Sequence, residues 1–78
     1  MSKVTVLGSG AWGTTLAQVL CDSGQDVLIW GRNSDVVNEI NNKNTNGKYL
    51  PGISLPSQLR ATVDILEAFD FGDSLVLA

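Results

Sequence analysis

Apolar positions along the chain change their spacing several times, and each spacing predicts an element. Residues 3–7 and 26–30 are short apolar runs rich in β-branched side chains, as expected for strands covered on both faces of a parallel sheet. Between them, four apolar residues recur at helical spacing: Leu16, Ala17, Val19 and Leu20. Gly24 follows where such a helix would end in a left-handed residue. The order strand, helix, strand predicts a βαβ unit with parallel pairing.

The middle of the chain predicts a short helix and a long loop. Ser34 is placed to cap a helix whose apolar side chains share one face: Val36, Val37 and Ile40. Residues 41–47 are polar and rich in asparagine, which favours a loop in which asparagine and glycine adopt positive φ. Residues 49–56 alternate apolar side chains with proline, a pattern typical of extended, turning chain outside a sheet interior.

The last third of the chain predicts a strand, a helix and another strand. Residues 59–62 suit a short strand, and Asp64 stands three residues before Glu67, a capping-box spacing that explains both acids better than acid–base chemistry does. Residues 74–78 form another apolar run typical of a buried strand, and the chain stops inside it. An exposed apolar strand edge favours pairing with another chain, so a homodimer is one expected state.

A glycine motif, G-x-G-x-x-G, occupies residues 8–13, directly after the first predicted strand and at the start of the first predicted helix. Gly8 permits a tight turn, Gly10 lets the backbone approach a pyrophosphate, and Gly13 lets the helix lie close to the strand. Taken alone, the motif also fits a structural turn, but here it stands within a complete βαβ pattern. The sequence therefore predicts dinucleotide binding on a Rossmann-type α/β fold, a doubly wound parallel sheet with strand order 3-2-1-4 and helices on both faces. We expect residues 1–78 to be the N-terminal part of such an NAD(P)-binding domain.

The end of the second predicted strand indicates which dinucleotide is preferred. An NAD site usually carries a carboxylate there, whereas an arginine can pair with the 2′-phosphate of NADP. This chain has Arg32 and Asn33 at that point and no carboxylate before Asp35. NADPH is therefore favoured over NADH without excluding it, although Arg32 also fits an ordinary solvated surface arginine.

Composition narrows the function classes. The net charge is −3 with no histidine, so nucleic acid and anionic membrane are poor partners. A lone cysteine, Cys21, offers neither an internal disulfide nor a zinc site, which indicates a packing role and a cytoplasmic protein. No apolar run is long enough for membrane insertion. We expect Trp30 to belong to the core or its margin, whereas Trp12 and Tyr49 fit cofactor contact and packing about equally. Lys43 and Lys48 fit solvated loop charges.

Three segments together resemble a known family. Residues 6–17 (VLGSGAWGTTLA), 28–32 (LIWGR) and 49–56 (YLPGISLP) are similar to the N-terminal part of the bacterial type of NAD(P)-dependent glycerol-3-phosphate dehydrogenase. The resemblance covers essentially the whole chain, and the segment 49–56 is more specific than the glycine motif. It implies an oxidoreductase that interconverts dihydroxyacetone phosphate and sn-glycerol 3-phosphate with NAD(P)H, feeding phospholipid synthesis. It also implies that the catalytic lysines and the substrate-phosphate site lie beyond residue 78, so no catalytic residue and no metal ligand is expected here.

The resemblance also implies which residues bind the cofactor. They are the residues of the glycine loop, those that end the second strand and the aromatic residue before Leu-Pro: Gly8, Gly10, Ala11, Trp12, Gly13, Arg32, Asn33 and Tyr49. Position 11 is often serine in the family, and alanine keeps the backbone amide that faces the phosphate. Two alternatives share these features: another β-hydroxyacid-type dehydrogenase or ketoacid reductase, and a non-enzymatic module that senses the dinucleotide.

Overall fold

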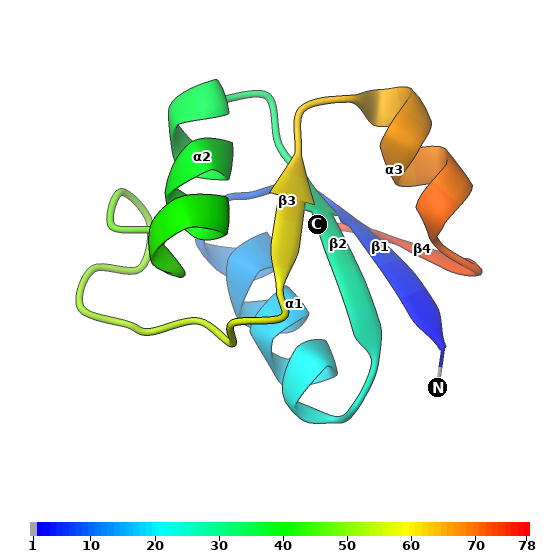
Figure 1. Cartoon of the computed structure of the whole chain (residues 1–78), viewed down its shortest axis with the longest axis horizontal. Coiled ribbons are helices and arrows are strands. Elements are labelled where there is room, and N and C mark those ends of the chain that lie inside the picture. Colours follow the sequence, from blue (N-terminus) through cyan, green and yellow to red (C-terminus); the bar gives the residue numbers. More distant parts are fainter. Residues whose placement is uncertain (1) are drawn as a thin grey trace.

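The computed structural model describes residues 2–78, which form a four-stranded parallel sheet with helices on both faces (Figure 1). The elements in chain order are β1 (Lys3–Leu7), α1 (Ala11–Asp22), β2 (Asp26–Trp30), α2 (Ser34–Lys43), β3 (Arg60–Thr62), α3 (Ile65–Phe71) and β4 (Ser74–Leu77). The strands lie in the order β3-β2-β1-β4, and every pairing is parallel. The predicted Rossmann-type sheet and its 3-2-1-4 order are confirmed.

Alternate side chains of β1 show how the two faces of the sheet are covered. Val4 and Val6 belong to the main core, together with Ala17 and Cys21 of α1. Thr5 points to the opposite face, where its hydroxyl donates a 2.7 Å hydrogen bond to the carbonyl of Ala68 in α3. Right-handed crossovers explain this division, because the chain moves one way across the sheet through α1 and α2 and returns the other way through α3.

The main core lies between the sheet and the layer formed by α1 and α2. Strand residues Val27 and Ile29 are buried there, and the chain after α2 adds Leu55 and Leu59. The predicted apolar face of α2 is confirmed, since its three apolar side chains are all buried: Val36, Val37 and Ile40. This core fixes the carboxyl ends of β1 and β2 side by side, with Leu7 opposite Trp30.

Some local predictions were wrong. Ser34 is the first residue of α2, and Asn33 is the residue that caps it, accepting from the N–H of Asp35 at 2.9 Å. Residues 41–43, expected in the loop, continue the helix, which ends only at Asn44 with φ of 55°. Asn44 thus adopts the positive φ expected within residues 41–47, and the helix ends three residues later than the pattern suggested.

Helix α1 buries part of the predicted stripe: Ala17 is buried and Leu20 packs against the core, but Val19 is not covered. Val19 is 55% exposed, whereas Gly13, Thr14, Ala17 and Cys21 are buried. Small side chains face the sheet because the start of the helix approaches the strands closely. The left-handed residue predicted after the helix is present, since Gly24 has φ of 92°.

The interpretation of the last strand as buried was also wrong for the described residues. Leu75 and Leu77 of β4 are exposed, Leu77 to 81%. The strand lies at the edge of the sheet and pairs only with β1 among residues 2–78. Leu75 and Leu77 are therefore open to solvent, whereas Val76 between them packs against the core.

Candidate functional site

The glycine loop, residues 8–10, connects β1 to α1 at the carboxyl edge of the sheet (Figure 1). Gly8 has φ of 134°, and its N–H donates a 2.8 Å hydrogen bond to the carbonyl of Trp30 at the end of β2. A Cβ at Gly8 would lie 2.7 Å from the carbonyl oxygen of Ala78. Both the positive φ and this crowding require glycine at the turn.

The other two glycines of the motif have opposite surroundings. A Cβ at Gly13 would overlap the backbone carbonyl of Gly8, so this glycine brings α1 against the loop. A Cβ at Gly10 would meet nothing within 4 Å. Gly10 is therefore not required by packing within the chain, and the space beside it is open to a ligand.

The N-terminus of α1 has no side-chain cap. Gly10 is the N-cap residue, and no acidic side chain stands in the first turn. The first backbone bond of the helix is from the N–H of Thr14 to the carbonyl of Gly10, at 2.9 Å. The other two helices are capped by side chains, α2 by Asn33 and α3 by Asp64. The first backbone N–H groups of α1 thus have no side-chain acceptor, and they lie at the positive end of the helix dipole, where an anion is favoured.

Ser9, between the first two glycines, is held from three directions. Its carbonyl accepts hydrogen bonds from the Thr14 hydroxyl at 3.1 Å and from the Asn46 amide at 2.9 Å. Its side chain occupies the space that a Cβ at Gly31 would need. Ser9 therefore joins the glycine loop to the end of β2 and to the loop after α2.

Sequence analysis missed Asn46, which is fully buried. Its Nδ2 donates to the Ser9 carbonyl and to the Thr14 hydroxyl, both at 2.9 Å. The position carried no motif and lay within a polar segment that predicted an exposed loop. Only its place, three residues before the Tyr-Leu-Pro segment, set it apart from the neighbouring asparagines.

Arg32 and Asn33 lie directly after β2, next to the glycine loop. Arg32 is exposed, and Gly31 before it is fixed to β3 by a hydrogen bond from its N–H to the carbonyl of Thr62, at 3.0 Å. The Asn33 side-chain oxygen is engaged in capping α2. Arg32 thus has freedom to reach a ligand, whereas Asn33 can offer only its amide N–H groups.

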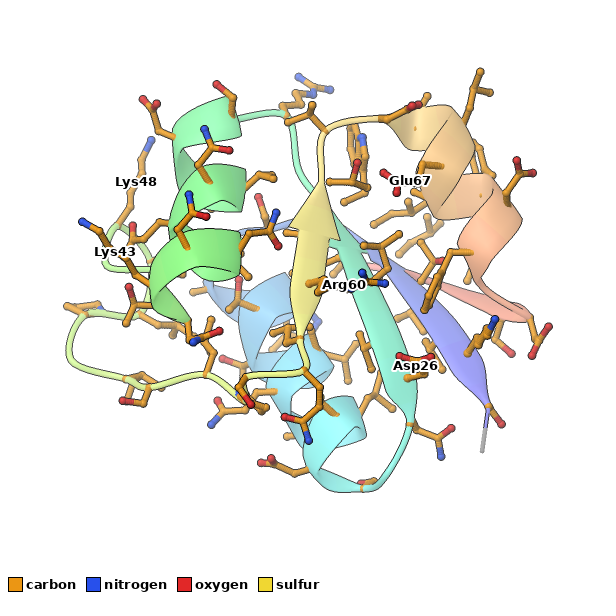
Figure 2. The ribbon with its side chains drawn as sticks, viewed as in Figure 1. Asp26, Lys43, Lys48, Arg60 and Glu67 are labelled. Atoms are coloured by element: carbon orange, nitrogen blue, oxygen red, sulfur yellow. The ribbon has the colours of Figure 1, made fainter. Side chains whose placement is uncertain are left out.

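Trp30 lies at the margin of the core, as expected, whereas Trp12 and Tyr49 are exposed. Trp30 is half-buried, and its Nε1 donates to the carbonyl of Val63 at 3.0 Å. Trp12 is 71% exposed in the first turn of α1. Tyr49 is exposed on the loop after α2, with the ammonium of Lys48 5.4 Å from its ring centre. Figure 2 shows Lys43 and Lys48 projecting outward on that side of the molecule.

The loop after α2 is anchored by Glu39. Its carboxylate accepts hydrogen bonds from the Thr45 hydroxyl at 2.6 Å and from the N–H of Gly47 at 2.7 Å. The bond from Thr45, and then that from Gly47, hold the pKa of the Glu39 carboxyl below its ordinary value. These two bonds flank Asn46 on either side.

Two cavities lie away from the glycine loop. One, of about 290 Å³, is lined by residues of β3 and α3, including Arg60 and Glu67, both labelled in Figure 2. Asp64 caps α3 as predicted, but the return bond of the capping box is not formed, because the N–H of Asp64 donates to the Thr62 hydroxyl, which itself donates to the Glu67 carboxylate. The other, of about 300 Å³, follows the polar face of α2. Neither holds a residue proposed for cofactor binding.

Residues 2–78 contain no cluster of potential metal ligands and no helix of the length and apolarity needed to cross a membrane. Cys21 is buried in the core, as expected of a packing residue. Burial, and then the neighbouring carboxylates of Asp22 and Asp26, raise the pKa of its thiol. Within the described chain, the uncapped helix start and its glycine loop are thus the feature best suited to ligand binding.

Comparison with known proteins identifies the family. The family model described as "NAD-dependent glycerol-3-phosphate dehydrogenase N-terminus" matches residues 3–78. The glycerol-3-phosphate dehydrogenases [NAD(P)+] of Bacillus thuringiensis (strain Al Hakam) and Bacillus mycoides (strain KBAB4) are each 54% identical over 68 residues, covering 87% of this chain. The chain spans 20% of the length of each of these relatives.

Solved structures agree. Glycerol-3-phosphate dehydrogenase from Coxiella burnetii superposes with a TM-score of 0.87 at 34% identity, covering 97% of this chain and 23% of its own. The enzyme from Saccharomyces cerevisiae gives 0.87 at 36% identity, covering 99% of this chain and 26% of its own. The chain therefore belongs to the NAD-dependent glycerol-3-phosphate dehydrogenase family, whose N-terminal part it matches.

Proposed function

We propose that this chain binds the pyrophosphate of NAD(P)H on its glycine loop. The observation that carries the proposal is the uncapped N-terminus of α1, beside a glycine whose missing side chain leaves open space. The donors are the backbone amides of residues 10–13, which act on the pyrophosphate with the helix dipole. Ala11 contributes its amide alone, so the absence of a hydroxyl at that position leaves this contact intact.

The exposed side chains around the loop would hold the rest of the cofactor. Arg32, at the end of β2, stacks on the adenine and pairs with a 2′-phosphate, which favours NADPH over NADH. Trp12, in the first turn of α1, and Tyr49, on the loop after α2, present exposed rings that suit contact with the cofactor. Asn33 contributes its amide N–H groups, because its oxygen caps α2.

We further propose that the intact protein interconverts dihydroxyacetone phosphate and sn-glycerol 3-phosphate, in support of phospholipid synthesis. The names of the relatives and the match over residues 3–78 support this activity. The bound nicotinamide would supply the hydride. Residues 1–78 form the N-terminal part of the cofactor domain in this proposal and contribute binding and orientation, whereas the proton donor and the substrate-phosphate site belong to parts that this chain does not include.

Location and assembly follow as secondary proposals. A single buried cysteine is compatible with a reducing compartment, which supports a cytoplasmic protein. The exposed apolar side chains of β4 support pairing between two copies of this chain.

The activity is tested by measuring reduction of dihydroxyacetone phosphate by the intact protein, with NADPH and NADH compared, before and after Arg32→Asp. We expect turnover that favours NADPH and a preference that the substitution removes, because a carboxylate repels the 2′-phosphate. Arg60→Asp, at the other arginine of the chain, is the matched control for the charge change and should keep the preference.

Other results point to the two alternatives. Nucleotide binding without turnover of dihydroxyacetone phosphate would refute the dehydrogenase assignment and favour a sensing module. Turnover of a ketoacid in place of dihydroxyacetone phosphate would favour a different reductase with the same cofactor loop.

A further inference from the structure

We propose that Asn46 is a positioning residue of the nucleotide site: it fixes the Ser9 carbonyl and so holds the glycine loop in the conformation that binds pyrophosphate. The inference rests on the proposed function of that loop. It assigns a role to a residue outside the G-x-G-x-x-G motif, 33 positions after its last glycine by the printed numbering.

The glycine loop has unusual backbone freedom. Ser9 stands between Gly8 and Gly10, and neither glycine restrains the backbone as a side-chain-bearing residue would. Rotation about these residues would turn the amides of the loop away from an anion. A fixed Ser9 carbonyl removes that freedom, since this group belongs to the peptide that leads into Gly10.

Two buried side chains fix the carbonyl. The Thr14 hydroxyl donates to it at 3.1 Å, and Asn46 Nδ2 donates to it at 2.9 Å. Asn46 Nδ2 also donates to the Thr14 hydroxyl at 2.9 Å, so the three groups form a closed triangle. Asn46 and Thr14 are both fully buried, and the bond between them is buried as well, which strengthens it relative to a bond in water.

The orientation of the Asn46 amide is determined by its partners. The backbone carbonyl of Ser9 can only accept a hydrogen bond. The NH₂ group of Asn46 must therefore face the glycine loop, and its oxygen must face away. That oxygen, Oδ1, is buried and has no hydrogen-bond partner among residues 2–78. Buried polar atoms are usually satisfied, so an asparagine kept here despite an orphan acceptor is explained by what its donors do for the loop.

The surrounding chain holds Asn46 in place. Glu39 binds the two neighbouring residues, Thr45 through its hydroxyl and Gly47 through its N–H. The backbone carbonyl of Asn46 accepts from the N–H groups of Tyr49 and Leu50, at 3.2 and 2.7 Å. The same residue therefore ties the glycine loop to the segment that carries Tyr49.

The test uses Asn46→Leu in the intact protein, with affinities for NADPH and for adenosine 2′-monophosphate measured by titration calorimetry. Leucine has nearly the same size and shape, removes both donors and also removes the orphan oxygen, while Ser9 keeps its bond from Thr14. We expect about a tenfold loss of NADPH affinity, the equivalent of one ordinary hydrogen bond. Affinity for adenosine 2′-monophosphate, which has no pyrophosphate, should stay within about twofold, since a difference that small is below one hydrogen bond.

Two further variants complete the design. Thr14→Val removes the second donor to Ser9 with little change of shape and should show the same selective loss. Asn42→Leu, at an exposed asparagine of α2, is the matched control and should leave both affinities unchanged. A thermal melt of each variant verifies that it is folded at the titration temperature.

The outcomes separate the two levels of the proposal. Equal losses for both ligands in Asn46→Leu and Thr14→Val would show a general structural role and overturn the inference, as would unchanged NADPH affinity in Asn46→Leu. Failure of the wild-type protein to bind NADPH would instead overturn the proposed function itself, and the inference with it.

Discussion

At the scale of single residues, the three glycines of the motif have different physical roles. Gly8 is required by its backbone conformation and Gly13 by the contact of α1 with the loop, whereas Gly10 has open space beside it. The structure of the chain alone therefore explains two of the glycines. We propose that the third serves a ligand that approaches the backbone.

This difference predicts that a methyl group added at Gly13 mainly lowers stability, whereas one added at Gly10 mainly weakens nucleotide binding. Gly13→Ala should destabilise the protein by about 1–3 kcal/mol, because the new Cβ meets the Gly8 carbonyl, and that clash outweighs the gain in helix propensity of at most about 1 kcal/mol. Gly10→Ala should cost about 0.5–1 kcal/mol of stability, because alanine is a poorer N-cap than glycine, and it should weaken nucleotide binding. Urea unfolding and NADPH titration of both variants measure the two effects. A Gly13→Ala protein as stable as wild type would contradict the packing argument.

At the scale of elements, the loop after α2 is ordered by a carboxylate. The Thr45 hydroxyl and then the Gly47 N–H hold the pKa of Glu39 below its ordinary value, so the folded state favours the charged form. The stabilisation is therefore fully present above the ordinary pKa of a glutamate and is lost as the pH falls through the lowered, folded-state pKa.

We predict that Glu39→Gln lowers stability at neutral pH and that the difference from wild type shrinks as the pH falls below the ordinary glutamate range. Urea unfolding of both proteins across that pH range measures the difference. Asp70→Asn, at an exposed carboxylate of α3, is the control and should show no comparable trend. A difference between wild type and Glu39→Gln that stays constant with pH would contradict the assigned role.

Prediction from sequence worked best for the elements that have a clear period. The strands β1 and β2 were predicted with their observed bounds, because unbroken apolar runs between glycines and charged residues leave little choice. The end of α2 was misplaced, because asparagine and lysine are compatible with both a last helical turn and a loop. The bound of that helix depends on Asn44, which takes the left-handed conformation that ends it.

At the scale of the whole molecule, the edge of the sheet formed by β4 exposes apolar side chains to solvent. Leu75 and Leu77 of β4 are exposed, as are Leu66 and Phe69 of the nearby α3. Exposed apolar strands at a sheet edge favour pairing with another strand. Copies of this 78-residue chain should therefore associate at raised concentration.

We predict that Leu77→Lys weakens this association, because a charge on an edge strand opposes burial against another chain. Sedimentation velocity over a concentration series measures the effect. Val19→Lys, at an exposed apolar residue of α1, is the control and should leave association unchanged. Equal association of wild type and Leu77→Lys would exclude β4 as the contact.

The βαβ order, the strand order, the glycine motif and the family could be predicted from sequence, because each depends on local spacing or on short specific segments. The burial of Asn46 against Ser9, the capping role of Asn33 and the exposure of Leu75 and Leu77 in β4 became known only from the folded structure. These facts depend on contacts between residues far apart in the chain, such as the 37 positions between Ser9 and Asn46. A polar residue in a polar segment carries no local sign of such a contact, since burial follows from how the whole chain packs and not from the residue or its neighbours.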